Sequence, residues 1–316
     1  MLELSIIIPT HSRREVLRAL LDRLLANDEV DHEIIVLDDA STDGTAEMLR
    51  AYPGVTVVRN ETSQGFDALP KAIAKARGAW LLFLDDDAYP AEGTLATVLA
   101  HARERGPQLG VIALPFQRPG TDRLSYTPYF PNMTPDMTYA PARAYHAGAV
   151  VVRREAAEQV PPSPPGYFMY ETEAPAMIEY LAHGWEADYL PGAPVFHVWD
   201  SRGPKVKERA AFLPLRNDFV TIDRYFRGWR RAEMLAGRYL TGFFHLAAAG
   251  SPFAVVRARR EARALLATLG TRDVSPDILE RVYPCFDGLT LMTFFSETNR
   301  RRVAWFFGRL PIDQTC

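Results

Sequence analysis

The sequence predicts an α/β protein whose mostly parallel central sheet is flanked by helices and followed by a helical extension. Strand-like and helix-like segments alternate through the first hundred of its 316 residues. The strand-like segments are almost entirely apolar, as expected when helices cover both faces of a parallel sheet. From residue 205 onward the pattern is helical and rich in arginine, which predicts the extension.

The elements predicted in the first part are strand 4–10, helix 14–27, strand 32–39, helix 41–52, strand 55–60, helix 65–78 and strand 79–87. The first strand is apolar and β-branched and stops at Pro9. The first helix has apolar residues at helical spacing, namely Val16, Leu17, Leu20, Leu21, Leu24 and Leu25. The second helix begins with the cap-forming residues Ser41, Thr42 and Asp43. The third contains Pro70, which is unfavourable inside a helix.

The rest of the chain is predicted to add a second half and the extension. Residues 105–145 are irregular and rich in proline and aromatic residues, which is typical of a binding loop. Residues 146–160 are predicted to form a strand and a helix, and residues 161–199 a loop, a helix and a closing strand. The predicted division is an α/β domain of residues 1–204, with halves 1–100 and 101–204, and a helical region of residues 205–316.

Composition argues against several classes of protein. The net charge is −3 and the pI is near 6.2, which argues against nucleic-acid binding. The two cysteines, Cys285 and Cys316, allow neither a disulfide framework nor a zinc site. The N-terminal strand lacks the zones of a signal peptide, and no apolar run reaches the roughly 18 residues of a spanning helix. We expect a cytoplasmic protein.

Charge is unevenly distributed along the chain. Residues 1–200 contain 16 Lys and Arg against 28 Asp and Glu, a net charge of −12. Residues 201–316 contain 20 against 11, a net charge of +9. The acidic part would repel anionic ligands unless a divalent cation intervened, whereas the basic part could face phosphates or an anionic membrane surface.

Polar residues follow the predicted strands at the edge where such sheets bind ligands. They are residues 9–12, Asp38, Asp39, Asn60, Glu61 and the aspartates 85–87 of "FLDDDAYP". Neighbouring carboxylates raise one another's pKa, and burial makes their ionisation costlier still. Either the triplet is a solvated turn, or a cation lies among the carboxylates. The acidic pair 38–39 is expected at the same edge, which favours the cation.

Several stretches occur in the order of a known family: "LSIIIPTHSRREVL", "EIIVLDDASTDGT", "GFDALPKAIAKARGAWLLFLDDDAYP", "HAGAVVVRREA", "GYFMYETE" through "LAHGW", "FHVWDS" and "RND". Over residues 3–225 the chain resembles the inverting family 2 glycosyltransferases of the GT-A type, especially the bacterial rhamnosyltransferase-like members. The resemblance implies the GT-A fold and transfer of a sugar, with inversion, from a UDP- or dTDP-type nucleotide-diphosphate sugar to an acceptor hydroxyl. It also implies cell-surface polysaccharide or glycolipid synthesis, with the nucleotide bound by residues 1–100 and the acceptor by residues 101–204.

The resemblance implies a divalent metal ion, Mn²⁺ or Mg²⁺, held by the Asp-x-Asp residues Asp85 and Asp87. Carboxylate oxygens suit both ions, and the ion would bridge the two phosphates of the donor. In several enzymes of the same type a histidine at the place of His197 completes the metal shell or contacts the diphosphate. The alternative is that His197 is packed in the core.

The nucleotide-sugar-binding residues implied by the resemblance are Pro9, Thr10, Asp38, Asp39, Lys71, Asp86 and Arg202. Asp39 matches the residue that accepts a hydrogen bond from the nucleotide base. Asp38 has the alternative role of a cap or strand-end carboxylate. Lys71 stands near the place of the family's usual Arg or Asn and is either a phosphate contact or a solvated lysine. Arg202 would belong to a mobile lid over the diphosphate.

The general base is expected after the aromatic stretch "FMY". The family places it in a Glu-Asp pair, and alignment on Tyr170 puts Glu173 at the base position, with Glu171 as the second candidate. Such a carboxylate takes the acceptor's proton as the hydroxyl attacks. The departure from the usual pair leaves open that both glutamates only begin a helix, where carboxylates are favoured.

The basic and aromatic residues of the extension leave its partners open. Residues 224–250 either contact an inner membrane face, where lipid-linked acceptors would be found, or pack on protein, including a second copy in a homodimer. A catalytically weakened nucleotide-sugar-binding scaffold is the alternative function, motivated by the altered Glu-Asp pair. A dinucleotide-binding oxidoreductase is disfavoured because "PTHSRR" follows the first strand instead of Gly-x-Gly-x-x-Gly.

Overall fold

The computed structural model describes residues 2–120, 138–198 and 208–282. Its contacts divide the chain into an α/β unit, residues 1–168 and 172–201, and a helical unit, residues 169–171 and 202–316. The predicted boundary between two domains at residue 204 remains a prediction. The three residues 169–171 are grouped with the helices although they lie within the α/β sequence.

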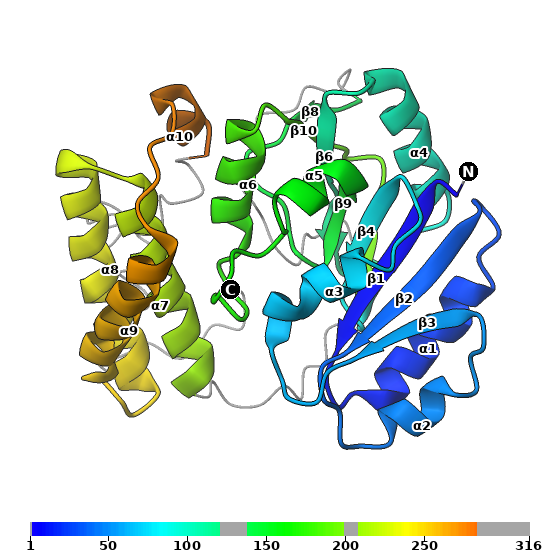
Figure 1. Cartoon of the computed structure of the whole chain (residues 1–316), viewed down its shortest axis with the longest axis horizontal. Coiled ribbons are helices and arrows are strands. Elements are labelled where there is room, and N and C mark those ends of the chain that lie inside the picture. The colour runs from blue at the N-terminus through cyan, green and yellow to red at the C-terminus, as the bar shows by residue number, and fades with distance from the viewer. Residues whose placement is uncertain (1, 121–137, 199–207, 283–316) are drawn as a thin grey trace. The chain divides into compact units, whose positions relative to one another are not determined.

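The α/β unit contains an eight-stranded sheet in the order β3-β2-β1-β4-β9-β6-β10-β8 (Figure 1). Its strands are β1 (Leu4–Thr10), β2 (His32–Asp38), β3 (Val55–Arg59), β4 (Trp80–Leu84), β6 (Leu109–Ala113), β8 (Ala140–Pro141), β9 (Ala149–Arg153) and β10 (Glu186–Tyr189). The first four strands are parallel, β9 runs antiparallel to β4 and β6, and β8 antiparallel to β10. The predicted mostly parallel sheet is confirmed.

A smaller sheet extends the edge that the aspartate triplet follows. It has the order β5 (Ala88–Pro90), β11 (Val195–His197) and β7 (Phe116–Gln117). The register of β11 and β5 pairs His197 with Ala88, the residue directly after the triplet. The backbone N–H of Val198 also donates to the carbonyl of Asp87 at 2.8 Å. The small sheet therefore brings His197 beside the triplet from more than 100 residues away in the sequence.

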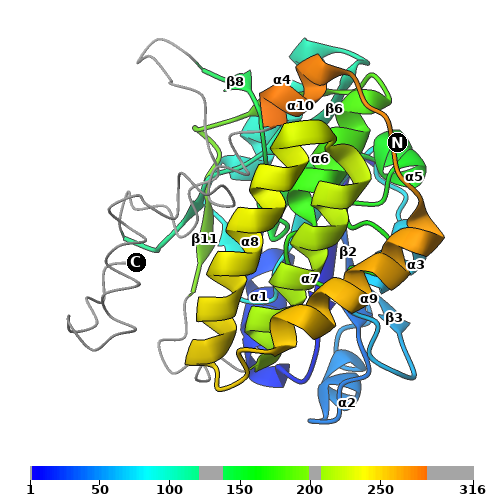
Figure 2. The ribbon, with the colours of Figure 1, turned by 90° about the vertical axis from the view of Figure 1, so that its left-hand side faces the viewer.

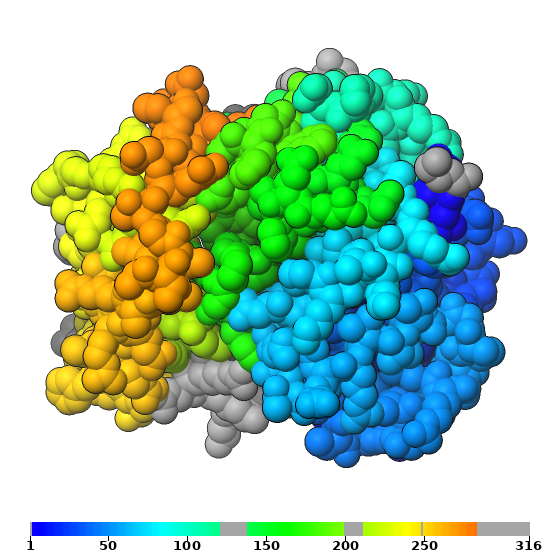
Figure 3. All heavy atoms as spheres, in the orientation of Figure 1, coloured from blue at the N-terminus to red at the C-terminus, as the bar shows by residue number. Residues whose placement is uncertain are grey.

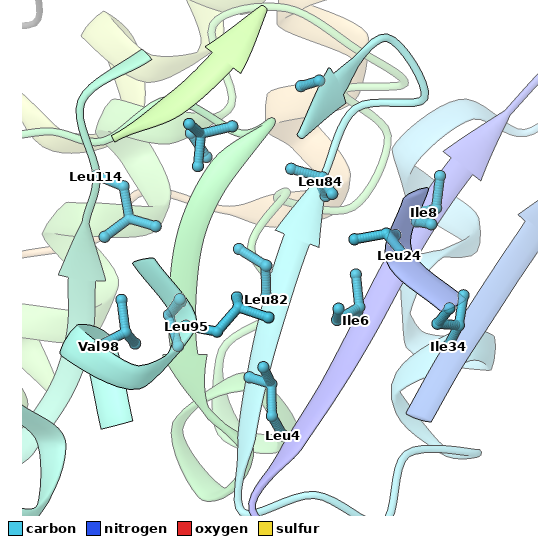
Figure 4. Packing of buried hydrophobic residues seen from close by; sticks show 14 of the residues in the cluster. Leu4, Ile6, Ile8, Leu24, Ile34, Leu82, Leu84, Leu95, Val98 and Leu114 are labelled. Carbon is cyan, nitrogen blue, oxygen red and sulfur yellow. The ribbon is translucent and has the colours of Figure 1, made fainter. Parts of the chain in front are cut away.

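Apolar side chains alternate between the two faces of the large sheet, and each face is covered by helices. One face packs with α1 (Arg14–Leu25), α2 (Thr45–Leu49) and α4 (Thr94–Arg105), through a buried cluster that includes Leu4, Ile6, Leu82, Leu24 and Val98 (Figure 4). The helices α3 (Leu69–Ile73), α5 (Arg154–Gln159) and α6 (Glu173–Ala182) cover much of the other face (Figure 3). This packing fixes the strand ends that carry the polar residues.

Two predicted local features differ from the structure. The helix predicted over residues 65–78 is a 3₁₀ turn, η1 (Gly65–Ala68), followed by the short helix α3, so Pro70 lies in the first turn of α3, where it costs no hydrogen bond. The expectation that helices cover both faces of every strand is wrong for β3, where Val57 is 41% exposed. β3 is an edge strand with few neighbours to bury it.

The helical unit consists of α7 (Glu208–Tyr225), α8 (Gly228–Ala248), α9 (Ala254–Leu269) and α10 (Pro276–Val282). Figure 2 shows α7 beside α8 and α9, and α7 packs against both. Several arginines of the helical unit form ion pairs within it. Arg231 and Arg259 pair with buried Asp223, and Arg238 pairs with buried Asp218.

These ion pairs neutralise some of the arginines whose charge suggested contact with a membrane or a second copy. Trp229, in the same region, is 77% exposed. Membrane contact and dimerisation through residues 224–250 stay predictions. None of the helices in the described part of the chain combines the length and the apolar character that a membrane crossing requires.

Candidate active site

Three strand ends meet at the carboxyl edge of the large sheet. Thr10 ends β1 and is paired in register with Asp38, which ends β2. The aspartate triplet begins one residue after β4 ends at Leu84, and Thr10 Oγ1 donates to Asp86 Oδ2 at 2.6 Å. The structure therefore brings together residues that the sequence placed at one edge.

Asp86 and Asp87 share one cation from the chain itself. The Arg13 guanidinium contacts Asp86 Oδ1 at 2.9 Å and Asp87 Oδ2 at 2.6 Å, and His197 Nε2 lies 3.3 Å from Asp87 Oδ1. Burial would raise the pKa of Asp87, but hydrogen bonds from His197 and Arg13 outweigh it, so the pKa is lowered. Burial raises the pKa of Asp86 to about 6 in spite of the opposing effects of Arg13 and Thr10.

Asp85 is the aspartate of the triplet whose ionisation is most strongly opposed by its surroundings. Burial, followed by repulsion from Asp87, Asp86 and Glu173, raises the pKa of Asp85 to about 7, and the charge of His197 only partly opposes this. A carboxyl group in this state becomes fully ionised when a cation is added beside it. The same interactions place Glu173, the predicted base, within electrostatic range of the triplet.

The donor atoms at this edge fit a hard divalent cation that also binds substrate. Within the described ranges, no three His, Cys, Asp or Glu side chains are arranged to hold a metal ion by themselves. Asp85 and Asp87 offer carboxylate oxygens, which suit Mn²⁺ and Mg²⁺, and His197 offers a ring nitrogen next to Asp87. An ion at this edge would be held by Asp85 and Asp87, as the resemblance implies.

Asp39 organises the loop that follows β3. Its Oδ1 accepts hydrogen bonds from Asn60 Nδ2 at 2.7 Å and Gln64 N at 2.8 Å, and its Oδ2 from Ser63 Oγ at 2.7 Å and Gly65 N at 2.9 Å. Burial opposes ionisation, but these four donors together lower the pKa of Asp39. A carboxylate has about four acceptor positions, so a nucleotide base would have to replace one of these donors.

We expect the substitution Asp39→Asn to make the free energy of unfolding change less as the pH falls. Because the pKa of Asp39 is lower in the folded state, its stabilising effect is complete above the unfolded-state pKa of about 3.9 and disappears as the pH falls through the folded-state pKa. At pH 7 the variant should lose about 2 kcal/mol of unfolding free energy. Urea unfolding at pH 7 and pH 3 measures this. An equal loss at both pH values contradicts the prediction.

The other residues predicted to bind the donor have diverse surroundings. Lys71 is exposed, and its Nζ donates to Asn60 Oδ1 at 2.7 Å and Gln64 Oε1 at 3.1 Å, so it braces the loop around Asp39. Asp38 is fully buried and accepts from Ser41 N at 2.9 Å, as a strand-end cap does. Pro9 is partly exposed in β1. Arg202 lies outside the described residues.

The two candidate bases belong to different units. Glu173 is the first residue of α6, and its Oε2 accepts from Thr172 N at 2.9 Å, while its Oε1 is 3.4 Å from Ala147 N. Glu171 is grouped with the helical unit, and burial of its carboxyl group raises its pKa while the charge of Arg238 opposes the shift. Only Glu173 therefore lies in the same unit as the aspartate triplet.

An aromatic stack behind His197 was not predicted from the sequence. The Phe116 ring stacks on His197 with centroids 4.6 Å apart and on His146 with centroids 4.1 Å apart. Burial, and then the charge of His197, lowers the pKa of His146 to about 4, and its Nδ1 accepts from Gly148 N at 3.1 Å. His146 is therefore neutral at pH 7. Neither His146 nor Arg13 was predicted as a site residue. Both lie in stretches that carried the family resemblance, His146 in "HAGAVVVRREA" and Arg13 in "THSRR".

We expect Gly148→Ala to displace the Asp85 carboxylate. A Cβ at residue 148 would lie 2.2 Å from Asp85 Oδ2, so one of the two groups must move. If Asp85 holds a metal ion, as the resemblance implies, this movement should weaken Mn²⁺-dependent donor binding by about 10-fold or more, as measured by titration. The matched control is Gly54→Ala, whose Cβ would have no atom within 4 Å. Unchanged binding in Gly148→Ala would mean that Asp85 does not take part.

Comparisons with known proteins show similarity to glycosyltransferases. Residues 5–160 match the sequence model of Glycosyl transferase family 2. An uncharacterized glycosyltransferase of Haemophilus influenzae is 42% identical over 86 residues, which cover 27% of this chain and 29% of that protein. The poly(ribitol-phosphate) beta-N-acetylglucosaminyltransferase TarS of Staphylococcus aureus is 32% identical over 111 residues, covering 33% of this chain and 19% of TarS. The chain thus spans less than a third of either relative.

Two solved structures share the fold. TarS in complex with UDP-GlcNAc has a TM-score of 0.57 at 16% identity, covering 98% of this chain and 89% of that one. The mannosyltransferase PcManGT from Pyrobaculum calidifontis, in complex with GDP-Man and Mn²⁺, has a TM-score of 0.57 at 18% identity, covering 96% and 84%. The architecture is therefore the GT-A fold, as the sequence predicted. Residues 5–160, just under half of the chain, thus match glycosyltransferase family 2, and the curated relatives found by sequence are glycosyltransferases.

Proposed function

We propose that the protein transfers a sugar from a nucleotide-diphosphate sugar, of UDP or dTDP type, to an acceptor hydroxyl with inversion. One observation carries the proposal: His197 lies 3.3 Å from Asp87 of the aspartate triplet, and Glu173 is close enough to Asp85 to help raise its pKa. A carboxylate for the acceptor proton and acidic groups for a cation are the two parts that such a transfer needs. The match of residues 5–160 to the family model supports the same reaction.

The donor would bind at the acidic edge. Mn²⁺ or Mg²⁺, held by Asp85 and Asp87 with His197 beside them, would neutralise the charge that develops on the departing diphosphate. Arg13 supplies positive charge from the chain itself, and its pairing with Asp86 and Asp87 holds both carboxylates in place. The loop around Asp39 is the proposed position of the nucleotide base.

The acceptor would bind next to Glu173. Its carboxylate accepts the hydroxyl proton while the hydroxyl oxygen forms a bond to C1 of the sugar, from the face opposite the diphosphate. The bond between C1 and the diphosphate oxygen breaks, and the nucleoside diphosphate leaves with both electrons. The hydrogen bond from Thr172 N to Glu173 Oε2 at 2.9 Å fixes the carboxylate, whereas its other oxygen is 3.4 Å from Ala147 N.

We further propose that the acceptor is a glycan or a lipid-linked glycan of cell-envelope synthesis. The TarS name describes transfer to poly(ribitol-phosphate), a polymeric acceptor. This part of the proposal rests on that relative and on the resemblance, since residues 121–137 of the irregular segment expected to contact an acceptor lie outside the described residues.

A thermal-shift panel of UDP-, dTDP- and GDP-sugars with and without Mn²⁺ tests donor binding. A ligand that binds only the folded state raises the melting temperature by mass action. We expect a rise of several degrees with one UDP- or dTDP-sugar, and only when Mn²⁺ is present. GDP-sugars serve as the comparison because PcManGT was solved with GDP-Man. No shift with any nucleotide sugar would refute the proposed function.

A further inference from the structure

The chain leading to the proposed base has an unfavourable backbone conformation. Phe168, Tyr170 and Glu171 have φ angles of 67°, 66° and 51°, in the left-handed region that side chains with a Cβ rarely adopt. Only two other non-glycine residues in the described ranges have a positive φ. Such strain persists only where the surrounding structure holds it, and it concentrates at functional sites.

Asn217 on α7 holds this segment. Its Nδ2 donates to the carbonyl of Met169 at 2.9 Å and to that of Tyr170 at 2.7 Å. Tyr170 is the residue between those two peptide groups, so the two hydrogen bonds span one of the unfavourable φ angles. The Asn217 side chain is fully buried. Loss of its NH₂ group would therefore leave two buried carbonyls without these hydrogen bonds.

The amide of Asn217 is itself oriented. Its Oδ1 accepts from Arg216 Nε at 3.0 Å and Nη2 at 2.8 Å, which leaves the NH₂ group directed to the two carbonyls. An aspartate at this position would have the same shape but no donor, and its charge would face two carbonyl oxygens. The donor function of Asn217, rather than its volume, therefore holds residues 169–171.

The segment ends at the atom that fixes the base. Thr172 N, which donates to Glu173 Oε2 at 2.9 Å, belongs to the peptide group that joins Glu171 to Thr172. The direction of this N–H therefore depends on the backbone angles of Glu171, one of the three residues with positive φ. If the segment relaxes, the N–H turns, and the Glu173 carboxylate loses its hydrogen bond.

We propose that Asn217 is a positioning residue for the Glu173 carboxylate, acting through the backbone of residues 169–172. The proposal rests on the proposed function, because it assumes that Glu173 is the base. Misplacement of a catalytic group by about 1 Å can reduce a rate 10²-fold. Asn217 should therefore affect the chemical step and leave donor binding intact.

The test compares Asn217→Asp with the matched control Thr221→Val. Thr221 lies one turn further along α7, is buried, and donates its hydroxyl to the carbonyl of Asn217, so its loss perturbs the helix but not the segment. In Asn217→Asp we expect kcat to fall by about 10- to 100-fold with donor Kd unchanged within twofold. Thr221→Val should retain kcat even if its melting temperature falls.

Hydrogen exchange at the Thr172 amide gives a readout that does not need turnover. Asn217→Asp should reduce its protection at least tenfold, whereas Thr221→Val should not. Unchanged protection, or kcat within twofold of the wild type, would overturn the positioning role. Turnover that survives in Glu173→Gln would instead refute the base assignment. Failure of Asn217→Asp to change kcat while Glu173→Gln is inactive would refute only the role of Asn217.

Discussion

Glu173→Gln is expected to reduce sugar transfer by about 10²–10⁴-fold while donor affinity stays within twofold of the wild type. Glutamine keeps the size of the side chain but cannot take the acceptor's proton. The carbonyl oxygen of the substituted side chain can still accept from Thr172 N, as Glu173 Oε2 does at 2.9 Å, so α6 should begin as before. Initial rates at saturating donor and acceptor measure the loss, and calorimetric titration measures donor affinity.

The matched control is Glu158→Gln, the same substitution at an exposed residue of α5. It should have wild-type kcat and wild-type donor affinity. Full activity in Glu173→Gln would remove Glu173 from the mechanism. Donor binding without turnover on any acceptor, in the wild type as well, would favour the nucleotide-sugar-binding scaffold over the enzyme.

Asp87→Asn is expected to abolish the Mn²⁺-dependent rise in melting temperature with donor and to reduce transfer by about 10²–10³-fold. The substitution removes the charge that pairs with Arg13 at 2.6 Å and with His197 at 3.3 Å, together with one of the two carboxylates proposed to hold the ion. Asparagine preserves the shape, so the apo protein should still unfold cooperatively. The thermal-shift assay with and without Mn²⁺ measures the first effect, and initial rates the second.

Asp22→Asn is the control for this change because Asp22 is an exposed residue of α1. It should leave both the metal-dependent shift and the rate unchanged. A normal Mn²⁺-dependent shift in Asp87→Asn would contradict the assignment of the metal to this edge. A shift that becomes independent of Mn²⁺ would mean that Arg13, freed from Asp87, binds the donor phosphates without an ion.

The pattern of the sequence predicted the strands and the edge at which they place their polar ends. Hydrophobic periodicity is a local property, and a run such as residues 4–10 or 32–38 can be recognised as buried without knowing its neighbours. The position of Asp38, Asp39 and residues 85–87 at one edge followed from the parallel order of their strands. The strand predicted within residues 146–160 is β9, but its antiparallel direction could not be predicted, since strand direction leaves no trace in an apolar run.

The alternation of strands and helices, the acidic edge and the resemblance to a family could all be predicted from the sequence alone. The arrangement of charged groups at that edge required the folded structure: Arg13 lies between Asp86 and Asp87, and His197 lies beside Asp87. Glu173 is near Asp85, while Glu171 is grouped with the helices. The physical reason is distance along the chain. Burial patterns arise within a few neighbouring residues, whereas the Arg13–Asp87 bond joins residues 74 positions apart, and its geometry exists only after the sheet has formed.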